Sequence, residues 1–169
     1  MLNSLLNKLP FVQEKEGDME IVIRPFQPKD QIATQNLILA GLEEHWGALD
    51  PGRNPDLDDI GRAYGHGRFL VAECDGEIVG TGALLLEKGN YGRIVRMSVA
   101  KEKRRQGIAT AILNELIAFA HQSGCVYLTL ETTATWTDAI QFYLRNNFAI
   151  THYAEGNVYF RRNLPENSP

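Results

Sequence analysis

The chain of 169 residues is long enough for one folded domain and short for two. Its formal net charge of −4 argues against an overall electrostatic attraction to nucleic acid or to an anionic membrane surface. No stretch approaches the ~20 consecutive apolar residues that span a bilayer, and the N-terminus lacks the basic and apolar regions of a secretory signal. We therefore expect a cytoplasmic protein with no stable membrane association and no nucleic-acid partner.

The two cysteines, Cys74 and Cys125, lie in separate apolar runs. Neither belongs to a CxxC pair, and the four histidines show no spacing typical of metal ligands. We therefore expect two reduced, buried thiols and no metal site, as is usual for a cytosolic protein.

The two ends of the chain are expected to lie outside the folded domain. Residues 1–18 are expected to form an N-terminal appendage, and 164–169 a C-terminal tail, which leaves 19–163 as the domain. Four leucines on one helical face predict a short helix before Pro10: Leu2, Leu5, Leu6 and Leu9. Such a helix could pack on the domain, on a partner or on a membrane surface.

The domain is expected to begin with a strand and a helix. The apolar run 21–23 predicts a strand that is closed by Arg24-Pro25. Asp30 is the expected cap of the helix that follows. Residues 47–56 are rich in Gly, Pro, Asn and Asp, which indicates a loop, and a short helix is expected over 57–64.

Three strands are expected next, joined by turns at Asp75-Gly76 and Gly89-Asn90. Turns this short join antiparallel neighbours, so the three strands predict a meander. The expected strands are 68–75, 77–86 and 91–99.

The last part of the chain predicts a crossover. Apolar residues at helical spacing predict a helix over 106–122, a buried strand follows at 125–131, and a second helix is expected over 137–146. Two final strands are expected within 148–162. A strand, a helix and a strand in this order predict a parallel pair, so the fold class is α/β (α+β): a mixed, mostly antiparallel sheet of about seven strands with about four helices on its faces.

The turn between strand 91–99 and the next helix has the features of an anion site. The first N–H groups of a helix lack intrahelical partners, and the helix dipole adds positive charge there. Gly107 allows a bulky anion to approach the backbone, and four cations surround it: Lys101, Lys103, Arg104 and Arg105. The turn is neither a Walker A loop nor a GxGxxG fingerprint, and a plain basic loop remains the alternative interpretation.

At these residues the chain resembles the GNAT acyltransferase superfamily. The matching motif is Arg104-x-x-Gly107-x-Ala109 at the start of a helix, after a strand that ends in 97–99. A second match is a helix with Ala139 and Tyr143. The resemblance covers about 19–163 and implies a sheet whose parallel pair is splayed. The chain departs from the family pattern at Trp136, where the family often has Asn, and at Asn147, where it usually has Gly.

The resemblance implies acetyl-CoA as the cofactor, with its pyrophosphate on backbone N–H groups of 105–110. The pantetheine arm is expected between 97–99 and 125–131, paired with backbone groups of Met97 and Val99. The cofactor-binding residues implied in this way are Met97, Ser98, Val99, Arg104, Arg105, Gln106, Gly107, Ile108, Ala109, Thr110, Trp136, Ala139 and Phe142.

The resemblance also implies that a primary amine attacks the thioester directly in a ternary complex. A backbone N–H near Val99 is the expected donor to the oxyanion. Tyr143 is the expected acid for the leaving thiolate, and Glu131 is the expected base, directly or through water. Three other carboxylates are alternatives for the base: Glu43, Glu44 and Glu73.

The acceptor is expected to bind beside the first helix. Residues 43–59 contain six acidic residues and one basic residue, which would attract a cationic amine. The candidate acceptor-binding residues are Glu43, His45, Trp46 and Thr132. A small-molecule amine and a peptide or protein amine both remain open, as does a homodimer. The alternatives to an enzyme are a non-catalytic acyl-CoA-binding or regulatory module and, through 101–105, a nucleic-acid-binding protein.

Overall fold

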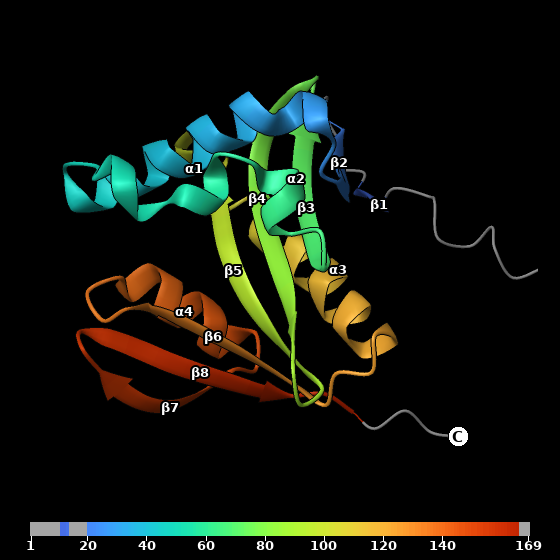
Figure 1. Ribbon diagram of the computed structural model, residues 1–169, viewed down its shortest axis with the longest axis vertical. Coiled ribbons are helices and arrows are strands. Elements are labelled where there is room, and N and C mark those ends of the chain that lie inside the picture. The colour runs from blue at the N-terminus through green and yellow to red at the C-terminus, as the bar shows by residue number, and fades with distance from the viewer. Residues whose placement is uncertain (1–10, 14–19, 166–169) are drawn as a thin grey trace, which may run out of the picture.

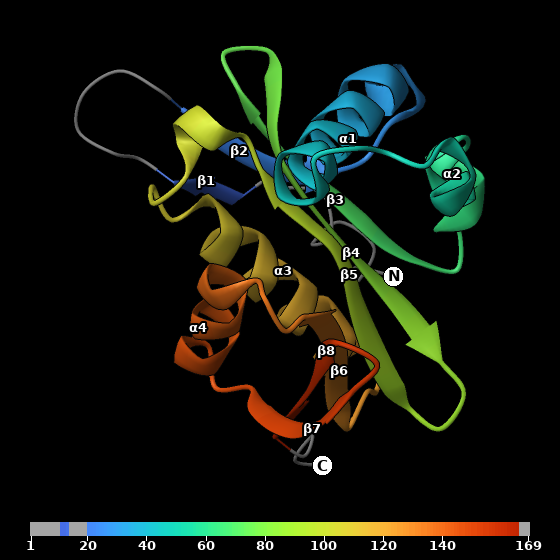
Figure 2. The same ribbon diagram turned by 90° about the vertical axis from the view of Figure 1, so that its left-hand side faces the viewer.

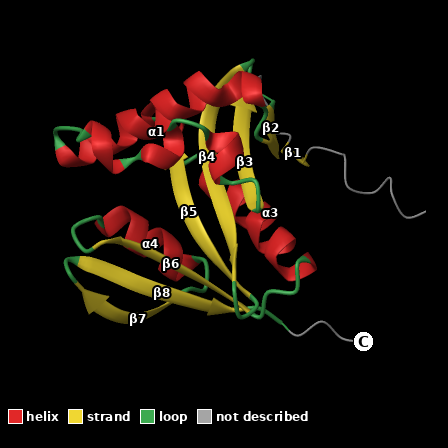
Figure 3. Cartoon of the chain, viewed as in Figure 1, coloured by secondary structure: helices red, strands yellow, loops and turns green. Residues whose placement is uncertain are grey.

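The computed structural model describes residues 11–13 and 20–165, which form a sheet with helices on both faces (Figures 1 and 3). In these residues the sheet has eight strands: β1 (Phe11–Gln13), β2 (Ile21–Pro25), β3 (Gly67–Cys74), β4 (Glu77–Glu87), β5 (Tyr91–Val99), β6 (Tyr127–Thr133), β7 (Ala149–Ala154) and β8 (Asn157–Asn163). The α-helices are α1 (Gln31–Trp46), α2 (Ile60–Ala63), α3 (Ile108–Gln122) and α4 (Thr137–Arg145). None of the helices described is long and apolar enough to cross a membrane.

The strands lie in the order β1-β2-β3-β4-β5-β6-β8-β7. Every neighbouring pair is antiparallel except β5 and β6, which run parallel over Tyr91–Arg93 and Tyr127–Thr129. The predicted fold class, with one parallel pair in a mostly antiparallel sheet, is confirmed. The additional strand is β1, in which residues 11–13 of the expected appendage pair with β2. The helix expected around the leucines of 2–9 lies outside the described residues.

Left-handed backbone closes the hairpins at the predicted turns. Asp75-Gly76 and Gly89-Asn90 both have positive φ at each residue, and so does Glu155-Gly156 between β7 and β8. Two consecutive positive φ angles give the turn whose twist matches that of the flanking strands. The meander of β3, β4 and β5 therefore follows from turn chemistry that the sequence displays.

The helices divide the interior into two apolar clusters. Helix α3 packs across β2 to β5 on one face, whereas α1 and α2 lie on the opposite face (Figure 2). The α3 cluster extends to α4 and the C-terminal strands, with Tyr143, Phe148 and Phe160 among its buried members. The cluster of α1 and α2 is smaller and contains Ile38 and Ile60.

Two glycines of β4 allow α3 to lie close to the sheet. A Cβ on Gly80 would stand 2.8 Å from Cγ2 of Ile108, and one on Gly82 would stand 2.6 Å from Cγ2 of Ile112. Both distances are shorter than atoms tolerate, so a larger residue would push the first turns of α3 outward. The glycines thus fix where α3 begins relative to β5.

Asp30 stands at the N-terminus of α1, but its carboxylate does not cap that helix. It accepts hydrogen bonds from the guanidinium of Arg24 at 2.7 and 2.9 Å and from the backbone N–H of Gln27 at 2.8 Å. The expected cap is therefore wrong in detail, because a buried guanidinium next to Asp30 needs a counter-charge more than the helix end needs a donor.

Candidate functional site

Strands β5 and β6 diverge after three paired residues. Beyond Arg93 and Thr129, β5 continues beside β4, while β6 continues beside β8 (Figure 1). The C-terminal halves of the two strands therefore have no sheet partner on the sides that face each other. This is the splay that the resemblance implied.

The backbone of β5 near its end is turned toward this divergence. The N–H of Ala100 donates to the carbonyl of Val79 at 2.9 Å, which makes Gly80 and Val99 a non-hydrogen-bonded pair of the β4–β5 ladder. The N–H and carbonyl of Val99 consequently point away from β4.

Half-buried apolar side chains stand on both sides of the divergence. Met97, Val99 and Ala100 lie at the end of β5, and Ala139 and Phe142 lie on α4; all five pack at the edge of the larger cluster. They are the apolar wall that a pantetheine arm would need. Their half-burial separates them from the closed core beneath.

The predicted anion turn is built from left-handed backbone. Arg105 has φ of 63° and Gly107 has φ of 83°, directly before the first turn of α3. Gly107 is the N-cap residue and has no side chain that could accept a hydrogen bond, so it does not cap the N–H groups of the first turn. Alternating left-handed residues turn successive N–H groups to one side, which favours anion binding. The side chain of Ile108 is buried in the core, which leaves its backbone alone to act in the turn.

Arg104 is engaged within the protein. Its Nε donates to the carbonyl of Val99 at 3.1 Å, and its terminal nitrogens donate to both carboxylate oxygens of Glu44 at 3.1 and 2.8 Å. These hydrogen bonds lower the pKa of Glu44, and Lys101 stands 3.5 Å away. Arg104 thus ties the turn to α1 and β5. Glu44 is held as a paired carboxylate, which does not suit a general base.

Tyr143 is buried at the heart of the larger cluster. Its ring packs against Phe148 at 5.8 Å and Phe160 at 5.7 Å between centroids. Burial raises the pKa of the phenol well above its usual range. The hydroxyl therefore keeps its proton at every physiological pH and can only donate it.

An aromatic stack connects α1 with the start of α4. The rings of His45 and Trp136 are stacked at 4.2 Å between centroids with 17° between their planes, and Trp46 meets His45 edge-on at 4.7 Å. Trp136 was predicted on the cofactor side, and His45 and Trp46 on the acceptor side. The structure brings these three residues together, across the divergence of the sheet.

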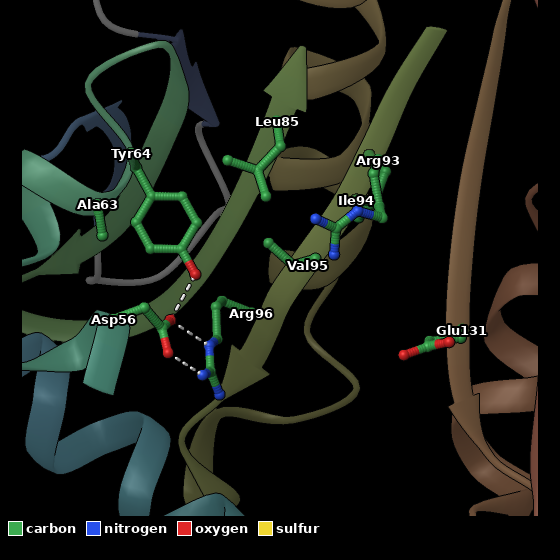
Figure 4. A pocket seen from close by; sticks show the side chains of 9 residues that line it. All are labelled: Asp56, Ala63, Tyr64, Leu85, Arg93, Ile94, Val95, Arg96 and Glu131. Atoms are coloured by element: carbon green, nitrogen blue, oxygen red, sulfur yellow. Dashed lines mark hydrogen bonds and ion pairs between the residues drawn. The ribbon is translucent and has the colours of Figure 1, made fainter. Parts of the chain in front are cut away.

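A pocket of about 440 Å³ lies on the face of the sheet opposite α3, beside α2 (Figure 4). Its volume falls within the range of small-molecule sites, roughly 300–1,000 Å³. Glu131 lines it from β6 and is the sequence-predicted site residue found there. The lining residues are Asp56, Ala63, Tyr64, Leu85, Arg93, Ile94, Val95, Arg96 and Glu131.

Arg96 stands at an irregularity of β5 and holds one wall of the pocket. Its φ is 56°, and the β4–β5 register shifts opposite it, between Thr81 and Ala83. Its Nε and one terminal nitrogen donate to the two carboxylate oxygens of Asp56 at 2.9 and 2.6 Å, and the hydroxyl of Tyr64 donates to the same carboxylate at 2.6 Å.

The hydrogen bonds among Asp56, Tyr64 and Arg96 keep the carboxylate ionised and the phenol protonated. Burial on its own would raise the pKa of Asp56, but the hydrogen bonds from Arg96 and Tyr64 outweigh it and leave that pKa lowered. Burial, together with Asp56, raises the pKa of Tyr64 to about 12. The carboxylate and the phenol are therefore fixed as acceptor and donor, and neither exchanges protons near neutral pH.

None of the four predicted acceptor residues lines the pocket, and two of them, His45 and Trp46, belong to the aromatic stack instead. Glu43 is exposed on the last turn of α1. Thr132 alternates with Glu131 along β6, so it lies on the other face of that strand. Neither lines the pocket. Of the remaining alternative bases, Glu73 on β3 is bound to Arg24 on β2 at 2.6 and 2.8 Å, away from the divergence of β5 and β6.

Sequence pattern did not predict most of the residues that line the pocket. Asp56 lies within the acidic segment, where nothing distinguishes it from its neighbours, and no motif contains Tyr64, Arg93 or Arg96. A signal was present in the alternation of β5, which places Arg93 on the face of the sheet opposite buried Ile94. Nothing in the sequence marks the irregularity that turns Arg96 to the same face.

Comparison with known proteins supports the resemblance. Residues 36–148 match the family described as Acetyltransferase (GNAT) family. Probable N-acetyltransferase family 8 member 5 of Mus musculus is 37% identical over 103 residues, which are 57% of this chain and 45% of that protein. The chain thus spans about half the length of this relative. IAA acetyltransferase of Azospirillum brasilense is 32% identical over 114 residues, which are 66% of this chain and 74% of that protein.

Solved structures show the same fold at low identity. An acetyltransferase of the GNAT family from Staphylococcus aureus superposes with a TM-score of 0.80 at 24% identity, over 86% of this chain and 99% of that one. The PaiA N-acetyltransferase of Thermoplasma acidophilum, solved in complex with coenzyme A, gives 0.75 at 16% identity, over 85% and 99%. The family match contains the anion turn, the diverging strands and Tyr143, and the chain therefore belongs to the acetyltransferase (GNAT) family.

Proposed function

We propose that the chain is an N-acetyltransferase that moves an acetyl group from acetyl-CoA to a primary amine by direct attack. The observation that carries this proposal is the position of the two half-sites. The anion turn begins α3 on one face of the sheet, and the polar pocket lies on the other face. Between them β5 and β6 diverge, so a thioester held there would be open to an amine from the pocket side.

The cofactor would lie along backbone rather than side chains. The N–H groups of 105–110 are available for a pyrophosphate, and the half-buried apolar residues beside the divergence suit the pantetheine arm. The N–H of Val99 points away from β4, and together with the backbone of Met97 it would supply donors to a pantetheine amide and to the thioester oxygen. Among the described residues no cluster of His, Cys, Asp or Glu could hold a metal ion, and the mechanism that we propose uses none.

Glu131 would move a proton, and Tyr143 would stabilise the leaving sulfur. Glu131, which lines the pocket from β6, would take a proton from the amine, directly or through water, as the C–N bond forms. Tyr143 would donate to the sulfur as the C–S bond breaks. Its raised pKa makes complete transfer to a thiolate unfavourable, so its hydrogen bond to the leaving sulfur is its main contribution.

Release of free thiol from acetyl-CoA in the presence of a panel of primary amines tests the proposal. We expect release with at least one amine and none without an acceptor above the background of hydrolysis. Tight binding of CoA without thiol release from any amine would overturn the enzymatic proposal. It would favour the alternative, a non-catalytic acyl-CoA-binding or regulatory module on the same fold.

A further inference from the structure

We infer that the pocket selects an amine that also carries a carboxylate, with Arg93 as the receptor for that carboxylate and Glu131 as the receptor for the amine. The inference rests on the proposed function and names its acceptor class, an α-amino acid or a related amino carboxylate. It follows from how far the protein itself satisfies the hydrogen-bond donors of the two guanidinium groups that line the pocket.

The acidic segment 43–59 contributes little unpaired negative charge to the pocket. Four of its six acidic side chains are engaged by the protein: Glu44 by Arg104, Asp50 by the N–H of Gly52, Asp56 by Arg96, and Asp59 by the N–H of Arg62. The other two, Glu43 and Asp58, are exposed and do not line the pocket. Of the six, Asp56 alone lines the pocket, and it is paired with Arg96.

The pocket itself is balanced in charge. Asp56 and Glu131 contribute two negative charges, and Arg93 and Arg96 contribute two positive charges. A polyamine would meet the guanidinium of Arg93 beside Glu131, which disfavours it relative to a zwitterion. A zwitterion meets a positive charge at Arg93 and a negative charge at Glu131.

Arg96 is closed to a ligand, because the protein satisfies it. Three of its nitrogens donate, two to Asp56 and one to the side-chain oxygen of Asn54 at 3.1 Å. Both oxygens of Asp56 are occupied in turn. This group forms a rigid wall and leaves Arg93 as the guanidinium that can respond to a ligand.

Arg93 has donors available. Its Nε donates to Glu87 at 2.9 Å, and its two terminal nitrogens have no hydrogen-bond acceptor in the described part of the chain. The guanidinium extends from β5 into the pocket between Tyr64 and Glu131 (Figure 4), and Arg93 pairs with Thr129, two residues before Glu131 on β6. Two parallel N–H donors on a planar group match a carboxylate in a two-point contact.

The remaining lining accounts for the rest of such an acceptor. Leu85 and Val95 form an apolar floor between Tyr64 and Arg93, and Ala63 leaves space beside α2 (Figure 4). An apolar side chain of an amino acid would lie on this floor. The amine would then lie toward Glu131 and the divergence, where the proposed thioester would be.

Matched acceptors test the inference: L-leucine and L-phenylalanine, their amides, and the amines that lack the carboxyl group altogether. We expect kcat/KM for the acids to exceed that for the amides by about 10- to 100-fold, the effect of one charge-assisted contact. The amides are the more easily deprotonated amines, so their intrinsic reactivity works against the expected result.

Variants of Arg93 then locate the preference. Arg93→Leu should lower kcat/KM for the acids toward that for the amides, leave the amides unchanged, and leave CoA affinity unchanged. Arg93→Lys should restore part of the preference, because it keeps the charge and loses the fork. Arg62→Leu is the matched control, since Arg62 is exposed on α2 and does not line the pocket.

The outcomes separate this inference from the proposed function. Thiol release at equal efficiency from acids and amides overturns the carboxylate receptor and leaves the transferase intact. A preference for acids that survives in Arg93→Leu overturns the role of Arg93. Absence of thiol release from every acceptor overturns the proposed function, and the inference with it.

Discussion

The anion turn and the acceptor pocket are built from different material. The turn is six consecutive residues whose backbone N–H groups form the proposed anion site, and left-handed φ at Arg105 and Gly107 shapes it. The pocket is made of side chains from a loop, α2, β4, β5 and β6, which are far apart in sequence. A backbone site depends on local conformation, whereas a side-chain site depends on long-range packing. Substitutions should therefore affect cofactor and acceptor separately.

The largest expected effect is on cofactor binding. Gly107→Val places a β-branched residue at φ of 83° and a side chain where a pyrophosphate must approach. We expect the affinity for acetyl-CoA, measured by calorimetry, to fall by about 100-fold, or about 2.7 kcal/mol. Gly124→Val is the matched control, because Gly124 ends the same helix at φ of 81° with open space around it. Equal loss of affinity in both variants would show general distortion of α3.

The next effect tests the pocket wall. Asp56→Asn removes the counter-charge of Arg96, whose side chain is 19% exposed against 29% for Asp56. We expect a loss of about 2 kcal/mol in the free energy of unfolding, measured in urea, together with a fall in acceptor turnover. Affinity for acetyl-CoA should be retained. Asp58→Asn, at the exposed neighbour, should change neither quantity; a similar loss there would mean that the whole loop responds.

The same contrast explains what the sequence could and could not predict. Hairpin turns, the periodicity of α3 and the Gly107 motif are local, so the fold and the cofactor end could be predicted from the sequence. The triad of Asp56, Tyr64 and Arg96 joins residues 40 positions apart, and its geometry depends on a bulge that no residue type announces. Sequence pattern identified the acidic segment but could not show that its carboxylates are paired.

Glu131 and Trp136 mark where local reasoning stopped. Glu131 was expected to end a strand over 125–131, but β6 runs from Tyr127 to Thr133, so Glu131 lies within it and alternation sets the face on which it lies. Trp136 was recognised as a departure from the family pattern, yet its stacking on His45 depends on how α1 ends on the other side of the divergence. That contact could not be predicted from either segment alone.

The proposed role of Tyr143 offers a third and smaller test. Tyr143→Phe should lower the rate of thiol release by about 10-fold while it retains affinity for acetyl-CoA, because only the hydrogen bond to the leaving sulfur is lost. Since burial raises the pKa of Tyr143, the ratio of the two rates should stay constant between about pH 6 and pH 9. Tyr153→Phe, at an exposed tyrosine, is the control. An unchanged rate in Tyr143→Phe would remove Tyr143 from the mechanism.

A smaller effect again is expected on how the stability contributed by Asp56 changes with pH. The pKa of Asp56 is lowered from 3.8 in the folded protein, so its contribution to stability is complete above that value and is lost as the pH falls through the lower folded pKa. The difference in unfolding free energy between the wild type and Asp56→Asn should therefore narrow by about 1 kcal/mol between about pH 5 and pH 2. Urea titrations at each pH measure it. A constant difference would mean that the carboxylate contributes through packing rather than through charge.

The smallest expected effect concerns the contact that joins the two regions. His45 was predicted to bind the acceptor and Trp136 the cofactor, and their rings stack at 4.2 Å. A double-mutant cycle with His45→Ala and Trp136→Ala should give a coupling energy of about 0.5–1 kcal/mol in the free energy of unfolding, because the cycle cancels what each ring contributes elsewhere. A control cycle with Trp46→Ala and Trp136→Ala should give a smaller coupling energy, since the ring of Trp46 contacts His45 rather than Trp136. If the first cycle gives no coupling, the two halves of the site are held together by the sheet and α3 alone, and the separation of cofactor and acceptor effects should then be complete.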